Sequence, residues 1–257
     1  MSIEVTAAAN GFIGEIRFAK PPFNYACPEL LRQIADAIDA FDADPAVRCI
    51  LLSSEGKSFC AGADLAGDDS IANADGMAAI GQLYVQAARI FGRKKPMVAA
   101  VQGAAIGAGL GLALTADFRI AAPTARFSAN FVRLGFHPGF ALTCTLPRLV
   151  GVQRASWMML SAERTKPEDA LAWGLVDRLS GEEGLMTAGR ALAGEIAANA
   201  PLALVAVRRT LVSGLAEQIE AAMRHEHAEQ TVLKATADYA EGVASVFERR
   251  EANFTGR

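Results

Sequence analysis

The first half of the chain alternates short apolar runs with longer stretches in which apolar residues recur at helical spacing. Apolar and polar residues alternate between residues 12 and 18, which predicts a half-buried strand that ends at a pair of prolines. The runs 49–52 and 97–101 are wholly apolar. Continuous apolar runs of this length are typical of interior strands in a parallel sheet, so we expect two such strands here.

Helical patterns follow these strands. Apolar residues recur every three or four positions in 28–41 and 77–90, which predicts two amphipathic helices. A glycine-rich turn at 103–109 leads into a predicted helix that ends near residue 116, and 118–122 is a further predicted strand. Because strand, loop and helix recur in this order, we expect the α/β class, with functional loops at the carboxyl ends of the strands.

The second half of the chain, from about residue 139, is mostly helical in pattern. The segment from Thr165 to Glu168 has the form of a capping box with a proline in the first turn, which predicts a helix start there. The apolar faces of the later helices must pack on the core or on another subunit. These later helices are predicted at 184–199, 201–213, 215–234 and 239–250.

One stretch has the length of a membrane-spanning helix. Residues 97–116 carry no charge, and about 20 apolar residues suffice to cross a bilayer. Gln102 and several glycines interrupt the stretch, however, so we expect a buried strand, a glycine turn and a buried helix rather than a membrane helix.

The overall composition excludes several function classes. Hydrophobic residues make up 52% of the 257 residues and the net charge is -3, which allows a large core and gives no basic footprint for nucleic acid. The four cysteines form neither a CxxC pair nor a metal-ligand spacing, so we expect no metal and a reducing compartment. The first residues lack the pattern of a secretory signal, and we therefore expect a cytoplasmic protein.

Two glycine-containing motifs, 56–65 (GKSFCAGADL) and 95–109 (KPMVAAVQGAAIGAG), each follow an apolar strand. Together and in this order they resemble the paired signatures of the crotonase (enoyl-CoA hydratase/isomerase) superfamily. The resemblance continues at 146–151, 165–176 and 241–247 and so covers nearly the whole chain. It implies a crotonase-like spiral of ββα units in residues 1–190 and a helical oligomerisation region in 191–257. It also implies a homotrimer or a dimer of trimers.

The resemblance assigns a catalytic role to two backbone amides. In the family, the amides at the positions of Ala63 and Ala108 donate to the thioester carbonyl oxygen of an acyl-CoA substrate and stabilise the enolate charge that develops there. Since the backbone does this work, the side chains must be small, and both positions hold alanine. Ala108 stands where the family usually has glycine.

The same resemblance predicts how coenzyme A is held, as a part of the substrate and not as a separate cofactor. The Ala61 carbonyl is expected to accept from the adenine amino group, and Lys20, Lys57 and either Arg250 or Arg257 are candidates for the phosphates. The alternative is that Lys20 and Lys57 are solvated surface lysines. The expected substrate-binding residues are Lys20, Lys57, Ala61, Gly62, Asp64, Leu65, Gly107, Gly111, Phe131 and Gly139.

The catalytic carboxylates of the family hydratases are missing. Gly111 and Phe131 stand at the positions of the two glutamates that act as acid and base, and Gly139 stands where some isomerases and dehalogenases carry a carboxylate. None of these side chains moves a proton. We therefore expect an isomerase- or lyase-type acyl-CoA enzyme that is not an ordinary hydratase.

His137 is the leading candidate to replace the missing acid, because histidine titrates near neutrality and lies beside the later carboxylate position. The alternative is a structural residue of the turn before Pro138. Asp68 and Asp69 could fold over the acyl group or form a solvated loop, and Asp64 is expected to form a turn. Asn130 is a candidate hydrogen-bond partner for substrate, and the alternative is a structural role. Phe131 and Phe136 indicate either an apolar or aromatic acyl pocket or core packing. His225 and His227 are expected to face solvent.

Two other function classes remain to be weighed. A non-catalytic acyl-CoA-binding or assembly subunit would explain the missing carboxylates but not the intact oxyanion loops. A nucleotide oxidoreductase is excluded, because Leu112 occupies the place of the third glycine of a dinucleotide-binding motif. No histidine and acid accompany the serines in a way that supports a catalytic triad.

Overall fold

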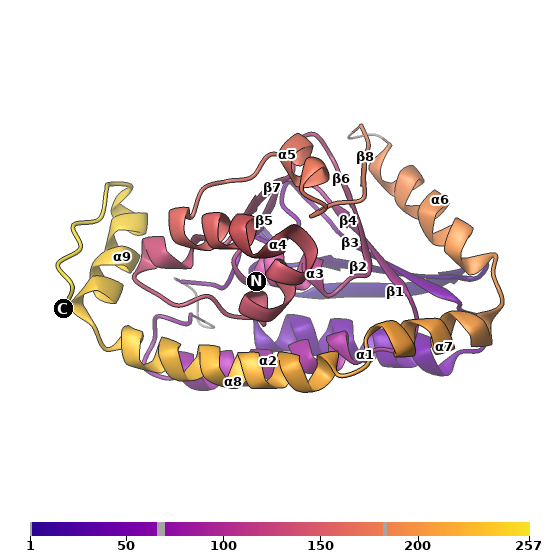
Figure 1. The fold of residues 1–257 in the computed structure, drawn as a ribbon, viewed down its shortest axis with the longest axis horizontal. Helices are drawn as coiled ribbons and strands as arrows, with labels where there is room; N and C mark the ends of the chain where they lie inside the picture. Colours follow the sequence, from indigo (N-terminus) through magenta and orange to yellow (C-terminus); the bar gives the residue numbers. More distant parts are fainter. Residues whose placement is uncertain (1, 66–69, 182–183) are drawn as a thin grey trace.

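A six-stranded sheet forms the centre of the protein (Figure 1). The structure is a computed structural model and describes residues 2–65, 70–181 and 184–257. The strand order is β1-β2-β3-β4-β6-β8, with β1 antiparallel to β2 and every other pair parallel. The strands are β1 (Glu4–Asn10), β2 (Ile13–Ala19), β3 (Cys49–Ser54), β4 (Met97–Val101), β6 (Phe118–Ala121) and β8 (Arg178–Leu179).

The two interior strands predicted from apolar runs, β3 and β4, are confirmed, and every residue of both is buried. Their side chains alternate between the two faces of the sheet, as the strand geometry requires. Ile50 and Leu52 belong to the larger core with α1 (Pro28–Ala43) and α2 (Gly76–Phe91), whereas Leu51 packs with α6 (Leu185–Ala197). The sheet is therefore covered by helices on both faces.

Four strands, β1, β5, β7 and the two-residue β8, were not predicted. β1 is rich in alanine and mostly exposed, so it lacks the apolar alternation that marks a half-buried strand. β5 (Ala104–Ile106) and β7 (Arg126–Ser128) form a separate parallel pair of three residues each, and β5 lies inside the segment that we expected to be only a glycine turn. Strands this short carry almost no periodic signal.

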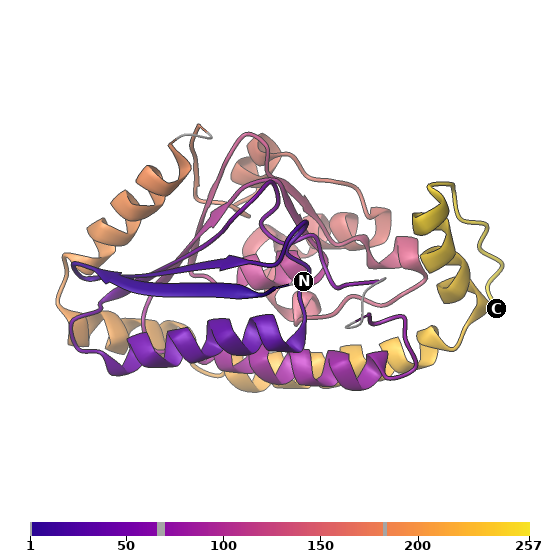
Figure 2. The ribbon, with the colours of Figure 1, turned by 180° about the vertical axis from the view of Figure 1, so that it is seen from behind.

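The helices predicted at 184–199, 201–213, 215–234 and 239–250 are confirmed within three residues at each end, whereas α4 (Leu142–Ser161) and η1 (Asn130–Leu134) had no predicted range. α8 (Leu215–Lys234) packs beside α2, and α9 (Ala237–Glu248) lies at the far end of the molecule, where it contacts η1 (Figures 1 and 2). A boundary at residue 190 would divide α6, which packs on the sheet. The elements are α3 (Ala108–Leu114), η1 (Asn130–Leu134), α4 (Leu142–Ser161), α5 (Pro167–Ala172), α7 (Pro201–Leu211), α8 (Leu215–Lys234) and α9 (Ala237–Glu248).

The predicted capping box at Thr165 is wrong, although the helix after it exists. Thr165 exchanges two backbone hydrogen bonds with Phe127 (3.1 and 2.8 Å), so its backbone belongs to a β-bridge. The N-cap of α5 is Lys166, which makes no side-chain cap bond, and Pro167 occupies the first turn as predicted. The tertiary pairing with Phe127 outweighs the local capping preference of threonine.

The uncharged stretch 97–116 forms the predicted strand β4 and helix α3, and the glycine turn between them contains the unpredicted β5. Within the described part of the chain, no single helix is long and apolar enough to cross a membrane. Only α6 and α7 taken together are long and apolar enough, and these two helices are bent by 99° relative to each other.

A buried ion cluster joins α7 to the sheet. The Asp117 carboxylate accepts from the Arg93 guanidinium (2.6 Å), from Arg208 Nε (3.1 Å) and from the Met97 amide (2.9 Å). The side chain of Arg93 is fully buried. Burial alone would raise the pKa of Asp117, but the charges of Arg93 and Arg208 outweigh burial and hold this pKa below its ordinary value.

Candidate active site

The loops that follow β3 and β4 meet and form one site. The Cys60 amide donates to the Ala104 carbonyl (2.8 Å), and the Ile106 amide donates to the Cys60 carbonyl (3.1 Å). These two bonds form a parallel bridge between Cys60 and Ala105. Because the carboxyl ends of neighbouring parallel strands share an edge of the sheet, the two sequence motifs are brought into contact there.

Glycine allows this close approach at two positions. Gly62 has φ of 103°, which disfavours other residues, and a Cβ there would lie 3.2 Å from the Ile106 carbonyl oxygen. A Cβ on Gly109 would lie only 1.9 Å from the Cys60 carbonyl oxygen. Any side chain at Gly109 would therefore push the two loops apart.

Ala63 and Ala108 line the same cavity, which has a volume of about 460 Å³. Ala108 is the first residue of α3, so its amide has no acceptor within that helix. Among the described residues, neither the Ala63 amide nor the Ala108 amide donates to a backbone carbonyl outside the regular elements. Both amides are thus placed beside one cavity, and the residues that the structure describes offer them no main-chain acceptor outside the regular elements.

The structure brings most of the predicted substrate-binding residues to this cavity. From the first loop these are Ala61, Gly62, Asp64 and Leu65, and from the second loop and η1 they are Gly107, Asn130 and Phe131. The Asp64 carbonyl accepts from the Ile71 amide (2.9 Å), in agreement with a role in the turn.

Sequence reasoning missed several lining residues. Val246 and Phe247 of α9 close one side of the cavity, and Phe23, Tyr25 and Arg164 also line it. Val246 and Phe247 are partly exposed apolar residues near the end of a helix, and nothing in their local pattern distinguishes them from a subunit contact. Arg164 directly precedes Thr165, where we expected a capping box and not a β-bridge, so its position at the cavity was not predicted.

The basic residues expected to bind the coenzyme A phosphates do not gather at the cavity. Lys20 and Lys57 do not line the cavity, and Lys57 is exposed. Arg250 forms ion pairs with Glu241 and Glu248, and the hydrogen bond to Glu241 raises the pKa of Arg250 above its ordinary value. Arg257, at the end of the chain, is exposed.

His137 is not brought to the cavity with Ala63 and Ala108. Its Nδ1 lies 2.7 Å from the Pro138 carbonyl oxygen, and its ring packs edge-on against His225, 5.9 Å away. This placement favours the structural alternative for His137.

The predictions for the two other histidines have different outcomes. His225 is exposed as predicted, but the prediction for His227 is wrong: His227 is half-buried, and its Nε2 lies 2.9 Å from the Met77 carbonyl oxygen. Asp68 and Asp69 lie outside the described residues.

Neighbouring side chains fill the space at Gly111 and Gly139. A Cβ on Gly111 would lie 2.6 Å from the Phe140 ring, and a Cβ on Gly139 would lie 2.0 Å from the Tyr84 hydroxyl oxygen. Gly111 is buried and does not line the main cavity, whereas Gly139 lines a smaller cavity beside it. The structure therefore has no room for a larger residue at either position without a rearrangement.

The thiol in the first loop of the site is not a source of thiolate near neutral pH. Cys60 lies in the first loop, and burial raises the pKa of its thiol to about 12, so it stays protonated near neutral pH. In the described ranges of the chain, no three histidine, cysteine or acidic residues gather in a group that could hold a metal ion.

Comparison with known proteins agrees with this architecture. The model of the enoyl-CoA hydratase/isomerase family matches residues 8–257. The chain belongs to this family. Enzymes of the family act on acyl-CoA substrates, and the crotonase-like fold expected from the two loops is confirmed.

Named relatives of this family include both hydratases and an isomerase. The chain is 36% identical over 232 residues to crotonyl-CoA hydratase of Syntrophomonas wolfei, covering 89% of this chain and 88% of that protein. It is 31% identical over 235 residues to 1,2-epoxyphenylacetyl-CoA isomerase of Escherichia coli, covering 89% of each. An enoyl-CoA hydratase/isomerase structure from Pseudoalteromonas atlantica superposes with a TM-score of 0.87 and 30% identity, covering 98% of this chain and 99% of that one.

Proposed function

We propose that the protein is an acyl-CoA enzyme of the isomerase or lyase type that stabilises a thioester enolate with the amides of Ala63 and Ala108. The observation that carries the proposal is that both residues line one cavity while, in the part of the chain that the structure describes, their amides have no main-chain acceptor outside the regular elements. Two fixed donors in a mostly apolar site stabilise charge that develops on the carbonyl oxygen, and they need no reorganisation during the reaction.

A matched pair of ligands tests this proposal directly. Butyryl-CoA has the thioester oxygen, and S-butyl-CoA replaces the carbonyl with a methylene group but is otherwise the same size. We expect titration calorimetry to show tighter binding of butyryl-CoA, because only its carbonyl accepts from the two amides. Equal affinities for the two ligands, or no binding of either, would contradict the proposal.

The protein is expected to hydrate crotonyl-CoA very slowly or not at all. Gly111 and Phe131 offer no acid or base, and the Phe140 ring occupies the space beside Gly111. The measurement is the loss of enoyl-thioester absorbance, with a hydratase of the family as the positive control. Rapid loss of absorbance would show that a group outside these positions activates water.

The absence of side-chain acids at these two positions also favours a second candidate function, an acyl-CoA-binding or assembly subunit without turnover. Asp64 is the only acidic side chain that lines the main cavity within the described segments. Turnover of any member of an acyl-CoA panel supports the enzyme, whereas binding of the whole panel without turnover supports the subunit.

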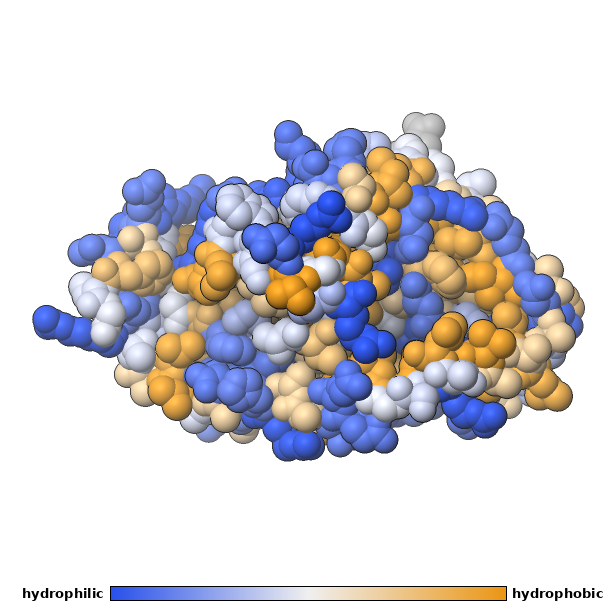
Figure 3. Space-filling model, viewed as in Figure 1, coloured by the Kyte–Doolittle hydropathy of each residue, from blue (hydrophilic) through white to orange (hydrophobic). Residues whose placement is uncertain are grey.

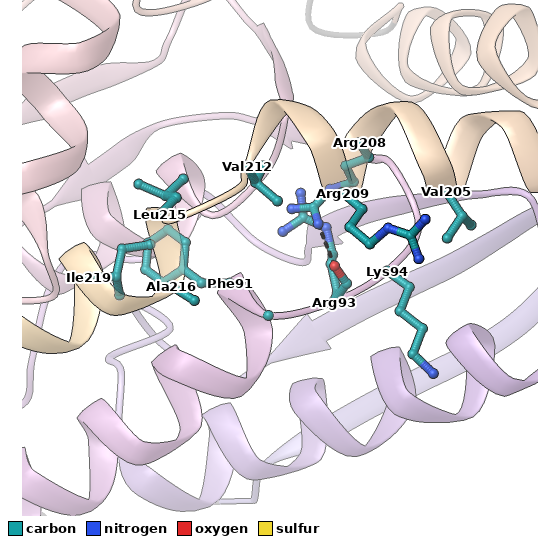
Figure 4. Close-up of a pocket in the computed structure, with 11 residues that line it drawn as sticks. Phe91, Arg93, Lys94, Val205, Arg208, Arg209, Val212, Leu215, Ala216 and Ile219 are labelled. Carbon is teal, nitrogen blue, oxygen red and sulfur yellow. Dashed lines mark hydrogen bonds between the residues drawn. The ribbon is translucent and has the colours of Figure 1, made fainter.

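We further propose that α7 forms a subunit contact in a homotrimer or dimer of trimers. Leu202, Val207 and Leu211 are strongly exposed, and apolar side chains gather over α7 in Figure 3. A cavity of about 300 Å³ lies between α7, the start of α8 and the segment from Phe91 to Lys94 (Figure 4). Light scattering is expected to give three or six times the mass of the chain, and a monomer mass would contradict this proposal. A cytoplasmic location stays a prediction from the sequence.

A further inference from the structure

The connection between η1 and α4, residues 135–141, borders the candidate site. Its Phe140 lines the smaller cavity, which has a volume of about 30 Å³ and shares Ala63 and Ala108 with the main cavity. The Phe140 ring also fills the space beside Gly111, where a Cβ would lie 2.6 Å from the ring. The position of this one ring therefore sets the shape of the site next to the two amides.

The backbone of this connection has a conformation that residues with side chains disfavour. Phe140 has φ of 63° and Ala141 has φ of 57°, so two consecutive residues other than glycine adopt left-handed values. Such values persist only where the surrounding structure enforces them. The contacts that hold residues 140 and 141 are therefore the contacts that place the Phe140 ring.

Glu226 of α8 supplies three of these contacts. Its side chain is fully buried, and its carboxylate accepts from the Ala141 amide (2.8 Å), the Thr143 amide (3.0 Å) and the Thr143 hydroxyl (2.6 Å). Ala141 is the N-cap residue of α4 and makes no side-chain cap bond. Glu226 thus takes the place of an N-cap side chain from 85 positions along the chain, and its charge suits a helix N-terminus.

Two neutral side chains hold the same connection. The Phe140 backbone forms a hydrogen bond with the Tyr84 hydroxyl, which donates to Gln230 Oε1 (3.0 Å). Gln230 Nε2 donates to the His137 carbonyl (3.0 Å). Within the described segments the Glu226 carboxylate only accepts hydrogen bonds, which is the pattern of an ionised group. Because hydrogen bonds to a charged group are the stronger ones, Glu226 contributes most to holding the connection.

We propose that Glu226 is a positioning residue of the candidate active site, which caps α4, holds Phe140 against Gly111 and so shapes the pocket for the acyl group. Glu226 is not among the described residues that line either cavity, so it acts through Phe140 and not on the substrate. This inference rests on the proposed function, because Phe140 meets an acyl group only if the thioester carbonyl lies at Ala63 and Ala108.

The test measures how much the acyl group adds to the affinity for coenzyme A. Titration calorimetry is run with CoA and with butyryl-CoA, and the ratio of the two affinities is the acyl preference. The wild-type protein is expected to bind butyryl-CoA about tenfold more tightly than CoA, the gain from burying about two methylene groups. In Glu226→Gln the acyl preference should fall to about one with the affinity for CoA unchanged, because an amide offers one acceptor oxygen to three donors.

A pair of variants at Thr143 tests the same contact with less risk to folding. Thr143→Val keeps the size of the side chain but removes the hydroxyl that donates to Glu226. It should lower the acyl preference about threefold, within the range for one hydrogen bond. Thr143→Ser keeps the hydroxyl and is the matched control, so it should show the wild-type preference. If Glu226→Gln does not fold, this pair decides the test.

A double-mutant cycle shows whether Glu226 acts through the ring. Phe140→Leu removes the ring and keeps a buried apolar side chain. If Glu226 acts by placing the ring, then adding Glu226→Gln to Phe140→Leu lowers the acyl preference no further. Losses that add in full would instead show two independent effects and would overturn the inference.

The remaining outcomes separate this inference from the proposed function. An acyl preference that survives both Glu226→Gln and Thr143→Val overturns only the inference. A loss that is equal for CoA and butyryl-CoA in these variants also overturns it, because Glu226 would then be a structural residue without a role in the acyl pocket. Equal affinities of the wild-type protein for CoA and butyryl-CoA, or no binding of either, overturn the proposed function as well.

Discussion

Replacement of Ala108 by proline is expected to reduce the turnover of any accepted acyl-CoA by about 10²–10³-fold, the usual effect of losing one oxyanion donor. Proline has no N–H, and Ala108 occupies the first position of α3, where a helix tolerates proline best. The change therefore removes the proposed donor with the least damage to the helix. Steady-state kinetics should show the loss in kcat more than in KM, because the donor acts mainly on the charge of the transition state.

Ala108→Gly serves as the control, since it keeps the amide and changes only a methyl group. We expect its kcat to stay within a few-fold of the wild-type value. If Ala108→Pro melts at the wild-type temperature and retains full turnover, then the Ala108 amide does not stabilise the reaction. If both variants lose activity equally, the loss comes from the changed side chain or from a distorted loop and not from the missing amide.

Removal of the Asp117 carboxylate is expected to have the largest effect on stability. Asp117→Ala leaves the buried guanidinium of Arg93 without its charge partner and the Met97 amide without its acceptor. Loss of one partner from a buried ion pair typically lowers the free energy of unfolding by about 3–5 kcal/mol. Urea unfolding measures the change. Asp117→Asn, which keeps an acceptor but no charge, should fall between wild type and Asp117→Ala.

Acid titration of the unfolding free energy gives a second measure of the same cluster. The folded-state pKa of Asp117 is lowered, so its charge contributes stability above the unfolded pKa of about 4, and this contribution is lost as the pH falls below that value. Asp117→Asn should lack this part of the acid sensitivity. For comparison, Glu163→Ala breaks the exposed pair with Arg133 and should cost at most about 1 kcal/mol. Equal losses for Asp117→Ala and Glu163→Ala would refute the special role of the buried cluster.

The sequence predicted the elements whose burial is periodic or continuous. β3, β4, α1 and α2 were found because their apolar residues either fill a whole run or recur at helical spacing. β1 and β5 were not predicted, because the formation of an alanine-rich or three-residue strand depends on pairing with its partner strand and not on its own sequence pattern. The failed capping box at Thr165 has the same origin, since its partner, Phe127, is 38 positions away (165 minus 127).

The candidate site, like the fold, was predictable only in part. The backbone positions were predictable because glycine and alanine motifs mark where two loops must approach closely, as Gly62 and Gly109 show. The polar side chains of the smaller cavity, Tyr84 and Gln230, were not predictable, because they come from two helices with ordinary amphipathic patterns. Only the packing of α8 against α2 brings them together.

The Phe140 ring beside Gly111 has a consequence for the mutational history of this chain. A larger residue at 111 would collide with the ring, since its Cβ alone comes within 2.6 Å, and such overpacking costs about 1–3 kcal/mol. A small residue at 140 would open a void while 111 remains glycine, at a cost of about 3–5 kcal/mol. Either change made first is thus penalised and the two together compensate. This is reciprocal sign epistasis, and it makes the present pair hard to change by single substitutions.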